Sequence, residues 1–226
     1  MKNLQFSDRI VTAAPNLKVL QIEAHVSNPP TSDALWEELE EVFNQISKTF
    51  QLNEINKRPS IQATRTVYKK LGKDPNRYRP SAEALSRRII NGKGIYRLTT
   101  LVDIINLISL QTGYSIGGFD ADQIQGDTLL LDVGNSSDSF EAIGRGILNI
   151  EGLPVYRDNV GGIGTPTSDE ERTKLTPETS YLLMLINIYG EETSSEIIES
   201  MTKDLLKKYA NLTEFNSKLH HVNKQG

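Results

Sequence analysis

The sequence predicts an α+β fold in which a mixed, mostly antiparallel sheet packs with helices. Three observations lead to this class. Segments with apolar residues at helical spacing lie mainly in the first half of the 226-residue chain and again near its end. Short β-like runs between glycine-rich turns separate them. The elements do not alternate as in a repeating β-α-β chain, and a chain of this length can bury a core without crosslinks.

The first elements are a strand and two helices. Residues 17–26 alternate apolar and polar side chains, which predicts a half-buried strand. Ser32 is a good N-cap for an amphipathic helix that continues to Phe50, and Trp36 is expected in the core. A second helix is predicted over residues 61–71, and the following Gly72 is expected to end it.

A linker and a third helix follow. The residues before Pro75 and Pro80 are biased away from helix, so residues 73–80 are predicted to be extended with their arginines exposed. Ser81 is expected to cap the next helix, whose later turns carry Arg87 and Arg88. Asn91 and the glycines after it end that helix.

The rest of the chain contains one core helix, the strands and a last helix. The core helix is predicted over residues 101–111, with Thr100 and Asp103 in capping-box order and Gly113 at its end. A capping box at residues 193–196 starts the last helix, and the tail after Asn211 is polar and expected to be frayed. Strands are predicted at residues 128–133, 147–157 and 181–190.

A strongly basic segment spans residues 57–97. It holds twelve lysines and arginines and two acids, a local charge of 12 − 2 = +10, in a chain whose formal net charge is −4. Tyr68, Tyr78 and Tyr96 lie among the cations, so the segment could offer both phosphate contacts and stacking to a single-stranded RNA end. Two alternatives are an ordinary solvated face and a structural clamp in which Arg87 or Arg88 pairs with the surplus acids.

Several kinds of chemistry are excluded or disfavoured. The absence of cysteine excludes disulfides and thiolate sites, and there is no phosphate-binding P-loop motif. The three histidines, His25, His220 and His221, do not make a convincing metal site or catalytic triad, because the last two fall in the expected tail. We expect no cofactor and no metal. The lack of a long apolar run leads us to expect a soluble, cytoplasmic protein with no membrane partner.

Two polar loops are candidates for a binding pocket. Residues 113–127 are rich in glycine and offer Tyr114 and Phe119 as aromatic surface. Residues 158–173 concentrate backbone N–H groups, hydroxyls and carboxylates. One interpretation is a network of turns with a helix start at Ser168. The other is a small polar pocket that would hold an α-amino or carboxyl group.

Three blocks of sequence resemble a known family. They are LGKDPNRYRPSAEALSRRII, LTTLVDIINLISLQTGYSIGGFDADQIQGD and VGGIGTPTSDEERT. In this order they resemble the free-standing relatives of the editing domain of the phenylalanyl-tRNA synthetase beta subunit, the B3/B4 domain, over residues 58–190. The middle block matches a V-D-x-x-N pattern followed by F-D. Gly117 stands where the synthetase segment carries a histidine, and the synthetase's glutamate beside its G-G-I motif has no clear counterpart.

The resemblance implies a synthetase editing-domain (B3/B4) fold and an RNA-associated function. An enzyme of this kind would be an aminoacyl-tRNA deacylase that hydrolyses mischarged aminoacyl-tRNA in trans, by water positioning rather than a strong base, and not a complete ligase. The first alternative is a non-catalytic module that binds tRNA ends or an amino-acid-like ligand. The second is a protein-interaction domain whose cationic face meets an acidic partner.

The predicted partners are tRNA or aminoacyl-tRNA, with no DNA expected, and no residue is assigned a catalytic role. The sequence predicts three parts: residues 1–57 packed on the main domain, 58–210 as the B3/B4-like domain and 211–226 as a polar tail. The residues chosen for phosphate contact are Arg79, Arg87 and Arg88. Those chosen for the pocket are Asn106, Asp120, Gly162, Thr165, Ser168 and Asp169.

Overall fold

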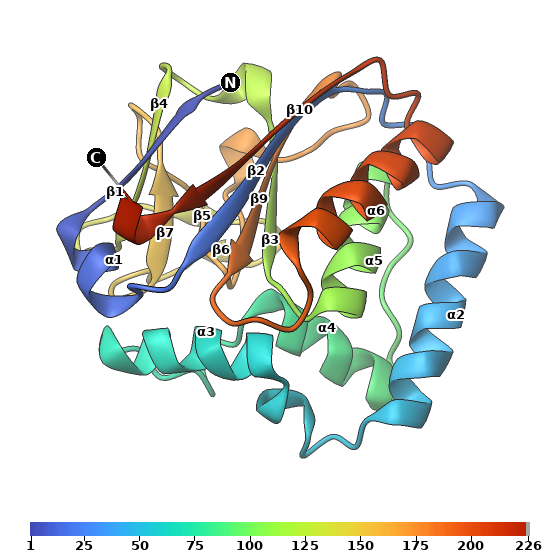
Figure 1. Cartoon of the computed structure of the whole chain (residues 1–226), viewed down its shortest axis with the longest axis horizontal. Coiled ribbons are helices and arrows are strands. Elements are labelled where there is room, and N and C mark those ends of the chain that lie inside the picture. The colour runs from blue at the N-terminus through green and yellow to red at the C-terminus, as the bar shows by residue number, and fades with distance from the viewer. Residues whose placement is uncertain (225–226) are drawn as a thin grey trace.

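The computed structural model describes residues 1–224 and confirms the α+β class. It has three layers, namely a layer of helices, a central antiparallel sheet and a second, mixed sheet (Figure 1). The central sheet has the strand order β10-β2-β9-β3, formed by Glu214–His221, Lys18–His25, Tyr181–Ile188 and Ile116–Asp120. The second sheet has the order β1-β4-β7-β8, formed by Asn3–Phe6, Thr128–Val133, Pro154–Arg157 and Gly162–Gly164.

Helices cover the face of the central sheet that points away from the second sheet (Figure 1). In the second sheet β1 and β4 are parallel and the other pairs are antiparallel, and β5 (Glu141–Ala142) and β6 (Gly146–Ile147) form a separate small ladder. The helices are α1 (Asp8–Ala13), α2 (Asp33–Thr49), α3 (Pro59–Lys70), α4 (Ser81–Ile90), α5 (Thr100–Thr112) and α6 (Ser195–Tyr209).

The strand predicted near the N-terminus is buried on both faces, not half-buried. β2 lies between β9 and β10 in the sheet. Its Leu20 and Ile22 pack into the helix-side core, while Val19, on the other face, packs between the two sheets. Two polar residues on the inner face, Gln21 and Glu23, are also buried. Such groups are stable inside only when they are hydrogen-bonded, and Glu23 accepts hydrogen bonds from Gln21 Nε2 and the Tyr181 hydroxyl.

Most helix ends lie where the sequence places them. The Ser32 hydroxyl caps α2 by accepting from the Leu35 N–H, and Ser194 caps α6 by accepting from the Ile197 N–H. Gly113 ends α5 with a φ of 73°, the left-handed conformation that glycine adopts without steric cost. Trp36 is only partly buried, and its Nε1 donates to Glu40.

Two predicted caps are wrong. Ser81 is the first helical residue of α4 and does not cap it; its N–H donates to the Pro166 carbonyl. The N-cap of α5 is Thr99, which makes no side-chain cap. Asp103 does not close a capping box, because its carboxylate accepts from the Leu98 N–H and the Thr31 hydroxyl instead.

The expectation of a frayed tail after Asn211 is wrong. Residues 214–221 form β10, which pairs antiparallel with the whole length of β2, and His220 Nε2 lies 2.8 Å from Gln21 Oε1. The strand predicted over 147–157 is also too long, since only β7 and the end of β6 fall within it. The division of the chain at residues 57 and 210 stays a prediction.

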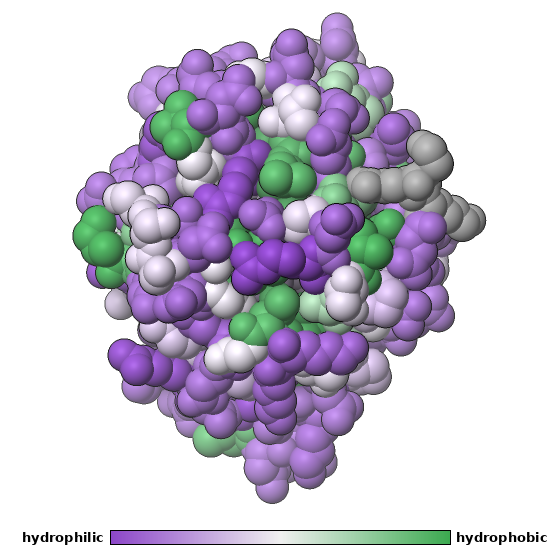
Figure 2. All heavy atoms as spheres, turned by 90° about the vertical axis from the view of Figure 1, so that its left-hand side faces the viewer, coloured by the Kyte–Doolittle hydropathy of each residue, from purple (hydrophilic) through white to green (hydrophobic). Residues whose placement is uncertain are grey.

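The side of the molecule at the left of Figure 1 has a mostly hydrophilic surface, with apolar residues in small separate patches (Figure 2). No helix in residues 1–224 combines the length and the apolar character that crossing a bilayer requires.

Candidate functional site

A cavity of about 380 Å³ lies where α4, α5, β3 and the 165–175 loop meet. Aliphatic side chains, among them Leu85, Ile105 and Leu175, form much of its wall. Binding sites are typically apolar cavities that carry a few placed polar groups, and this one has that character. Its polar groups come from α4, α5 and the loop, and they include Ser81, Asn106, Ser109, Ser168, Asp169 and Lys174.

The structure brings half of the predicted pocket residues together. Asn106, Ser168 and Asp169 line the cavity, whereas Asp120, Gly162 and Thr165 do not. Thr165 shapes the loop instead, because its hydroxyl accepts from the N–H groups of Thr167 and Ser168.

Asp120 and Gly162 have other structural tasks. Asp120 closes the end of β3 by accepting from the Thr179 hydroxyl. Gly162 lies in β8, where an added Cβ would meet Phe140 and Val155 at 3.0 and 3.1 Å.

Asp169 is the acidic group of the cavity. Its Oδ2 accepts a hydrogen bond from the Gly118 N–H at 3.2 Å, and no donor in residues 1–224 reaches its Oδ1. Burial raises the pKa of this carboxyl to about 7, because one backbone donor does not replace the hydration that the charged form loses.

Two glycines make room for this carboxyl and for the ring of Phe119, and a third lets β3 lie close to α5. A Cβ on Gly164 would lie 2.6 Å from Phe119 Cζ and 2.7 Å from Asp169 Oδ1. A Cβ on Gly117 would lie 2.6 Å from the same ring carbon. The Phe119 ring therefore occupies the space that a side chain at position 117 would enter. A Cβ on Gly118 would meet Ile105 at 2.3 Å, so β3 approaches α5 closely here.

The buried Asp103 lies one turn before Asn106 on α5. Burial raises the pKa of the Asp103 carboxyl, and hydrogen bonds from the Thr31 hydroxyl and the Leu98 N–H to its Oδ2 partly oppose that change. This carboxyl joins α5 to Thr31 in the segment after β2, which sequence reasoning did not anticipate.

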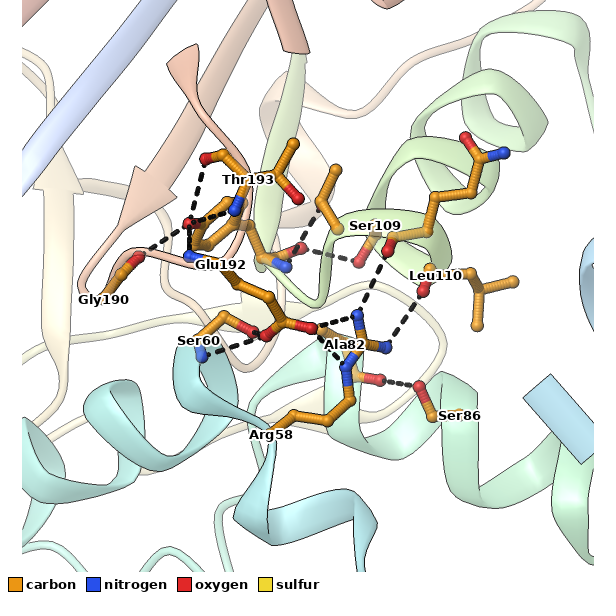
Figure 3. A network of polar contacts seen from close by, with 12 residues as sticks. Arg58, Ser60, Ala82, Ser86, Ser109, Leu110, Gly190, Glu192 and Thr193 are labelled. Atoms are coloured by element: carbon orange, nitrogen blue, oxygen red, sulfur yellow. Dashed lines mark hydrogen bonds and ion pairs between the residues drawn. The ribbon is translucent and has the colours of Figure 1, made fainter. Parts of the chain in front are cut away.

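Tyr114 and Phe119, offered as aromatic surface for a ligand, are both fully buried, so that prediction is wrong. The Tyr114 hydroxyl donates to the Gly190 carbonyl and accepts from the Glu192 and Thr193 N–H groups, which fixes the loop between β9 and α6 (Figure 3).

The three predicted phosphate-binding arginines lie in different surroundings. Arg79 is exposed, and within the described part of the chain it has no hydrogen bond or ion pair. Arg87 pairs with Glu83 at 2.8 Å, and it faces a separate hollow lined by residues 51–56. Arg88 donates to the Gly94 carbonyl, and its guanidinium lies 5.4 Å from the centre of the Tyr96 ring.

Arg88, Tyr96 and Leu98 form what we call the cavity rim. Arg88 is one turn after Leu85, which lines the cavity, and residues three apart lie on the same side of a helix. Leu98 also lines the cavity although it is 56% exposed, and Tyr96, two residues earlier, is 74% exposed. A cation and an open aromatic ring thus lie next to the cavity.

Three cations of the basic segment are buried and bind within the protein. Arg58 pairs with Glu192 and donates to the carbonyls at the end of α5 (Figure 3). Arg65 pairs with the fully buried Glu83, and Lys73 donates to two backbone carbonyls of the 149–151 turn. The other nine cations (12 − 3) are not buried, and two of them, Arg87 and Arg97, form ion pairs with Glu83 and Asp33.

Residues 1–224 contain no group of three histidine, cysteine, aspartate or glutamate side chains arranged to hold a metal ion.

Comparisons with known proteins place the chain in a family. The model of the B3/4 domain matches residues 63–204. A solved structure, an N-terminal fragment of the phenylalanyl-tRNA synthetase beta-subunit from Pyrococcus horikoshii, is similar with 12% identity and a TM-score of 0.47. The match covers 96% of this chain and 50% of that one, so the chain spans about half the length of the fragment. A search of curated proteins found no match. Because the family model covers more than half of its residues, the chain belongs to the B3/4 domain family.

Proposed function

We propose that this domain binds the aminoacylated 3′ end of a tRNA and hydrolyses the ester of a mischarged amino acid in trans. The amino acid enters the 380 Å³ cavity, while the terminal nucleotides lie over the rim. The observation that carries the proposal is the cavity itself, which joins residues from all three sequence blocks next to the half-buried Arg88 and the exposed ring of Tyr96.

The rim suits a single-stranded nucleic acid end. An exposed aromatic ring can stack on any base, and a neighbouring arginine can contact phosphate or extend the stack. Tyr96 and Arg88 offer this pair, and Arg79, two residues before the cavity residue Ser81, adds a second free cation. Arg87 contributes less, because Glu83 already occupies its guanidinium.

The reaction requires a positioned water rather than a strong nucleophile. Water attacks the ester carbonyl carbon and the bond to the ribose oxygen breaks. One proton of the water goes to the ribose hydroxyl, the other is released to solvent, and the amino acid leaves as a carboxylate. Asn106, Ser109 and Ser168 line the cavity and can hold such a water by hydrogen bonds.

A second candidate function is binding without hydrolysis. The observation in its favour is the ring of Phe119 beside Gly117, which fills the place of a side chain where the synthetase carries a histidine. The cavity lining as described contains no histidine.

A deacylation panel separates the two candidates. The protein is incubated with a set of correctly charged and mischarged aminoacyl-tRNAs, and ester loss is compared with the spontaneous rate. Loss above background for a mischarged species supports hydrolysis. Retained binding with no ester loss for any species supports the binding module.

The RNA contact is tested by the salt dependence of tRNA binding. Arg88→Ala should weaken binding and reduce the slope of log affinity against log salt by about 0.7, the value for one phosphate contact on a single strand. Lys48→Ala is the matched control, because Lys48 is an exposed cation on α2 outside the cavity lining. If both variants bind alike, or if tRNA does not bind at all, the proposed function is wrong.

A further inference from the structure

The cavity has one acidic group, and that group has a free acceptor atom. Asp169 and Lys174 are the charged residues among those lining the cavity. Asp169 Oδ2 is held by the Gly118 N–H, whereas Oδ1 has no hydrogen-bond partner in residues 1–224. Although it is unpaired, Asp169 Oδ1 is not fully buried and so remains accessible. It is therefore positioned to accept a hydrogen bond from a ligand in the cavity.

The Lys174 ammonium is not the partner of Asp169. Its Nζ forms an ion pair with Glu171 Oε1 at 2.7 Å, one short turn along the loop. The cavity thus keeps a lysine that is already neutralised and a carboxyl that is not. Buried charges in proteins are normally paired, so a carboxyl of this kind favours a cation supplied by the ligand.

The glycines show that this position is built to hold the carboxyl. Gly164 leaves the room that Asp169 Oδ1 occupies, since a Cβ there would come within 2.7 Å of the oxygen. Gly118 places its N–H against the other oxygen. The remaining lining is largely aliphatic, from Leu85, Ile105 and Leu175 among others, and would contact an apolar body next to the cation.

We propose that Asp169 receives the α-ammonium group of the ligand, so that the cavity selects amino-acid derivatives with a free amine and an apolar side chain. This inference names the ligand class of the cavity in the proposed function and rests on it. Amino acids whose amine is acylated, such as a formylated or acetylated aminoacyl group, would be rejected because they carry no charge and keep only one N–H donor.

The pH dependence of binding follows from two protonation states. The ligand amine must be protonated, and Asp169 must be ionised, although burial raises its pKa to about 7. The titratable groups around it are Lys174 in the cavity lining and the buried phenol of Tyr156, whose pKa burial raises well above its usual value. Affinity should therefore pass through a maximum near neutral pH, where both required forms coexist.

The test uses small ligands without RNA, so that its outcome is independent of tRNA binding. L-phenylalaninamide and N-acetyl-L-phenylalaninamide are titrated into the full chain, and chemical-shift changes or heats of binding give the two affinities. We expect the free amine to bind at least about tenfold more tightly, as expected for a charge-assisted hydrogen bond to a partly buried carboxylate.

The Asp169→Asn variant should remove this preference and the pH maximum, while weak binding of the acetylated ligand is retained. Asp122→Asn is the matched control, because Asp122 is an exposed carboxylate outside the cavity lining, and it should behave as the unaltered chain. Thermal melts of each variant show that it is folded.

Three results would overturn the inference: equal affinity for the two amides, no binding of either, or a preference that survives Asp169→Asn. p-Cresol serves as a further probe, since tight binding of this phenol with no preference for the amine would mean that Asp169 accepts from a ligand hydroxyl instead. If the amine preference is present but tRNA does not bind, the proposed function fails and the ammonium site stands.

Discussion

Ionisation of Asp169 should destabilise the fold as the pH rises from about 4 to about 7. The carboxyl has an ordinary pKa of 3.8, and burial in the folded protein raises that pKa to about 7. The folded state then holds the proton over a range in which the unfolded state has lost it. The resulting stability is fully present below pH 3.8 and is lost as the pH passes through about 7.

The magnitude follows from the interval between the two pKa values. At 1.36 kcal/mol for each pKa unit, the interval from 3.8 to about 7 corresponds to about 4 kcal/mol at most. Asp169 is partly exposed at the cavity, and water there reduces the cost of ionisation. We therefore expect a loss of about 2 kcal/mol between pH 5 and pH 8.

The assay is urea unfolding of the unaltered chain and of Asp169→Asn at pH 5, 6, 7 and 8. The difference between the two free energies of unfolding removes the contributions of all other titrating groups, provided that they are unchanged. That difference should shift by about 2 kcal/mol in favour of the asparagine variant as the pH rises. A difference that is the same at every pH would refute the reasoning, because it would mean that Asp169 has the same pKa in both states.

Three further predictions test the surrounding structure. Glu83→Ala should cost about 3–5 kcal/mol in chemical denaturation, because it leaves the buried Arg65 unpaired, and Glu83→Gln should cost less. Gly164→Ala should lower the free energy of unfolding by about 1–3 kcal/mol, while Gly161→Ala, which meets no atom within 4 Å, should change it by less than about 0.5 kcal/mol. Burial lowers the pKa of His220 to about 4, so the free energy of unfolding should fall as the pH drops from 6.5 towards 4. In thermal melts, the decrease in this free energy between pH 6.5 and pH 5 should be about 1 kcal/mol smaller for His220→Gln than for the unaltered chain.

Local features of the fold could be predicted because they depend on neighbouring residues. The cap at Ser32 and the glycine at 113 act within one helical turn, and both lie where the sequence indicates. The last helix is capped by Ser194 and not by Thr193, the first residue of the predicted capping box. The wrong cap at Asp103 has a different cause. Its carboxylate is taken by Thr31, a residue 72 positions away, which no local pattern can reveal.

Features set by distant pairings were missed for the same reason. Residues 214–221 are too polar to read as a core strand, although Phe215 and Leu219 alternate with polar residues and pack on the helix-side core. The strand forms because β2 leaves an edge to pair with it. The polar composition of this segment predicted a tail, whereas the alternation of its apolar and polar residues is typical of a strand.

The candidate site was likewise only partly predictable from the sequence. Ser168 and Asp169 were chosen from a loop dense in polar groups, and that loop does line the cavity. Asp120 and Thr165 lie in the same two loops and were indistinguishable by sequence, but their side chains turn to Thr179 and to the loop backbone. Loop side chains have no period that tells inward from outward positions, so only the structure separates them.

The place of β2 at the centre of its sheet has a consequence for synthesis on the ribosome. Glu23 of β2 hydrogen-bonds Tyr181 of β9, 158 positions later in the chain. At common rates of translation, roughly 10 to 30 s pass between the appearance of the two residues. During that time β2 lacks both neighbouring strands, and we expect the nascent chain to depend on chaperones until β9 and β10 have emerged.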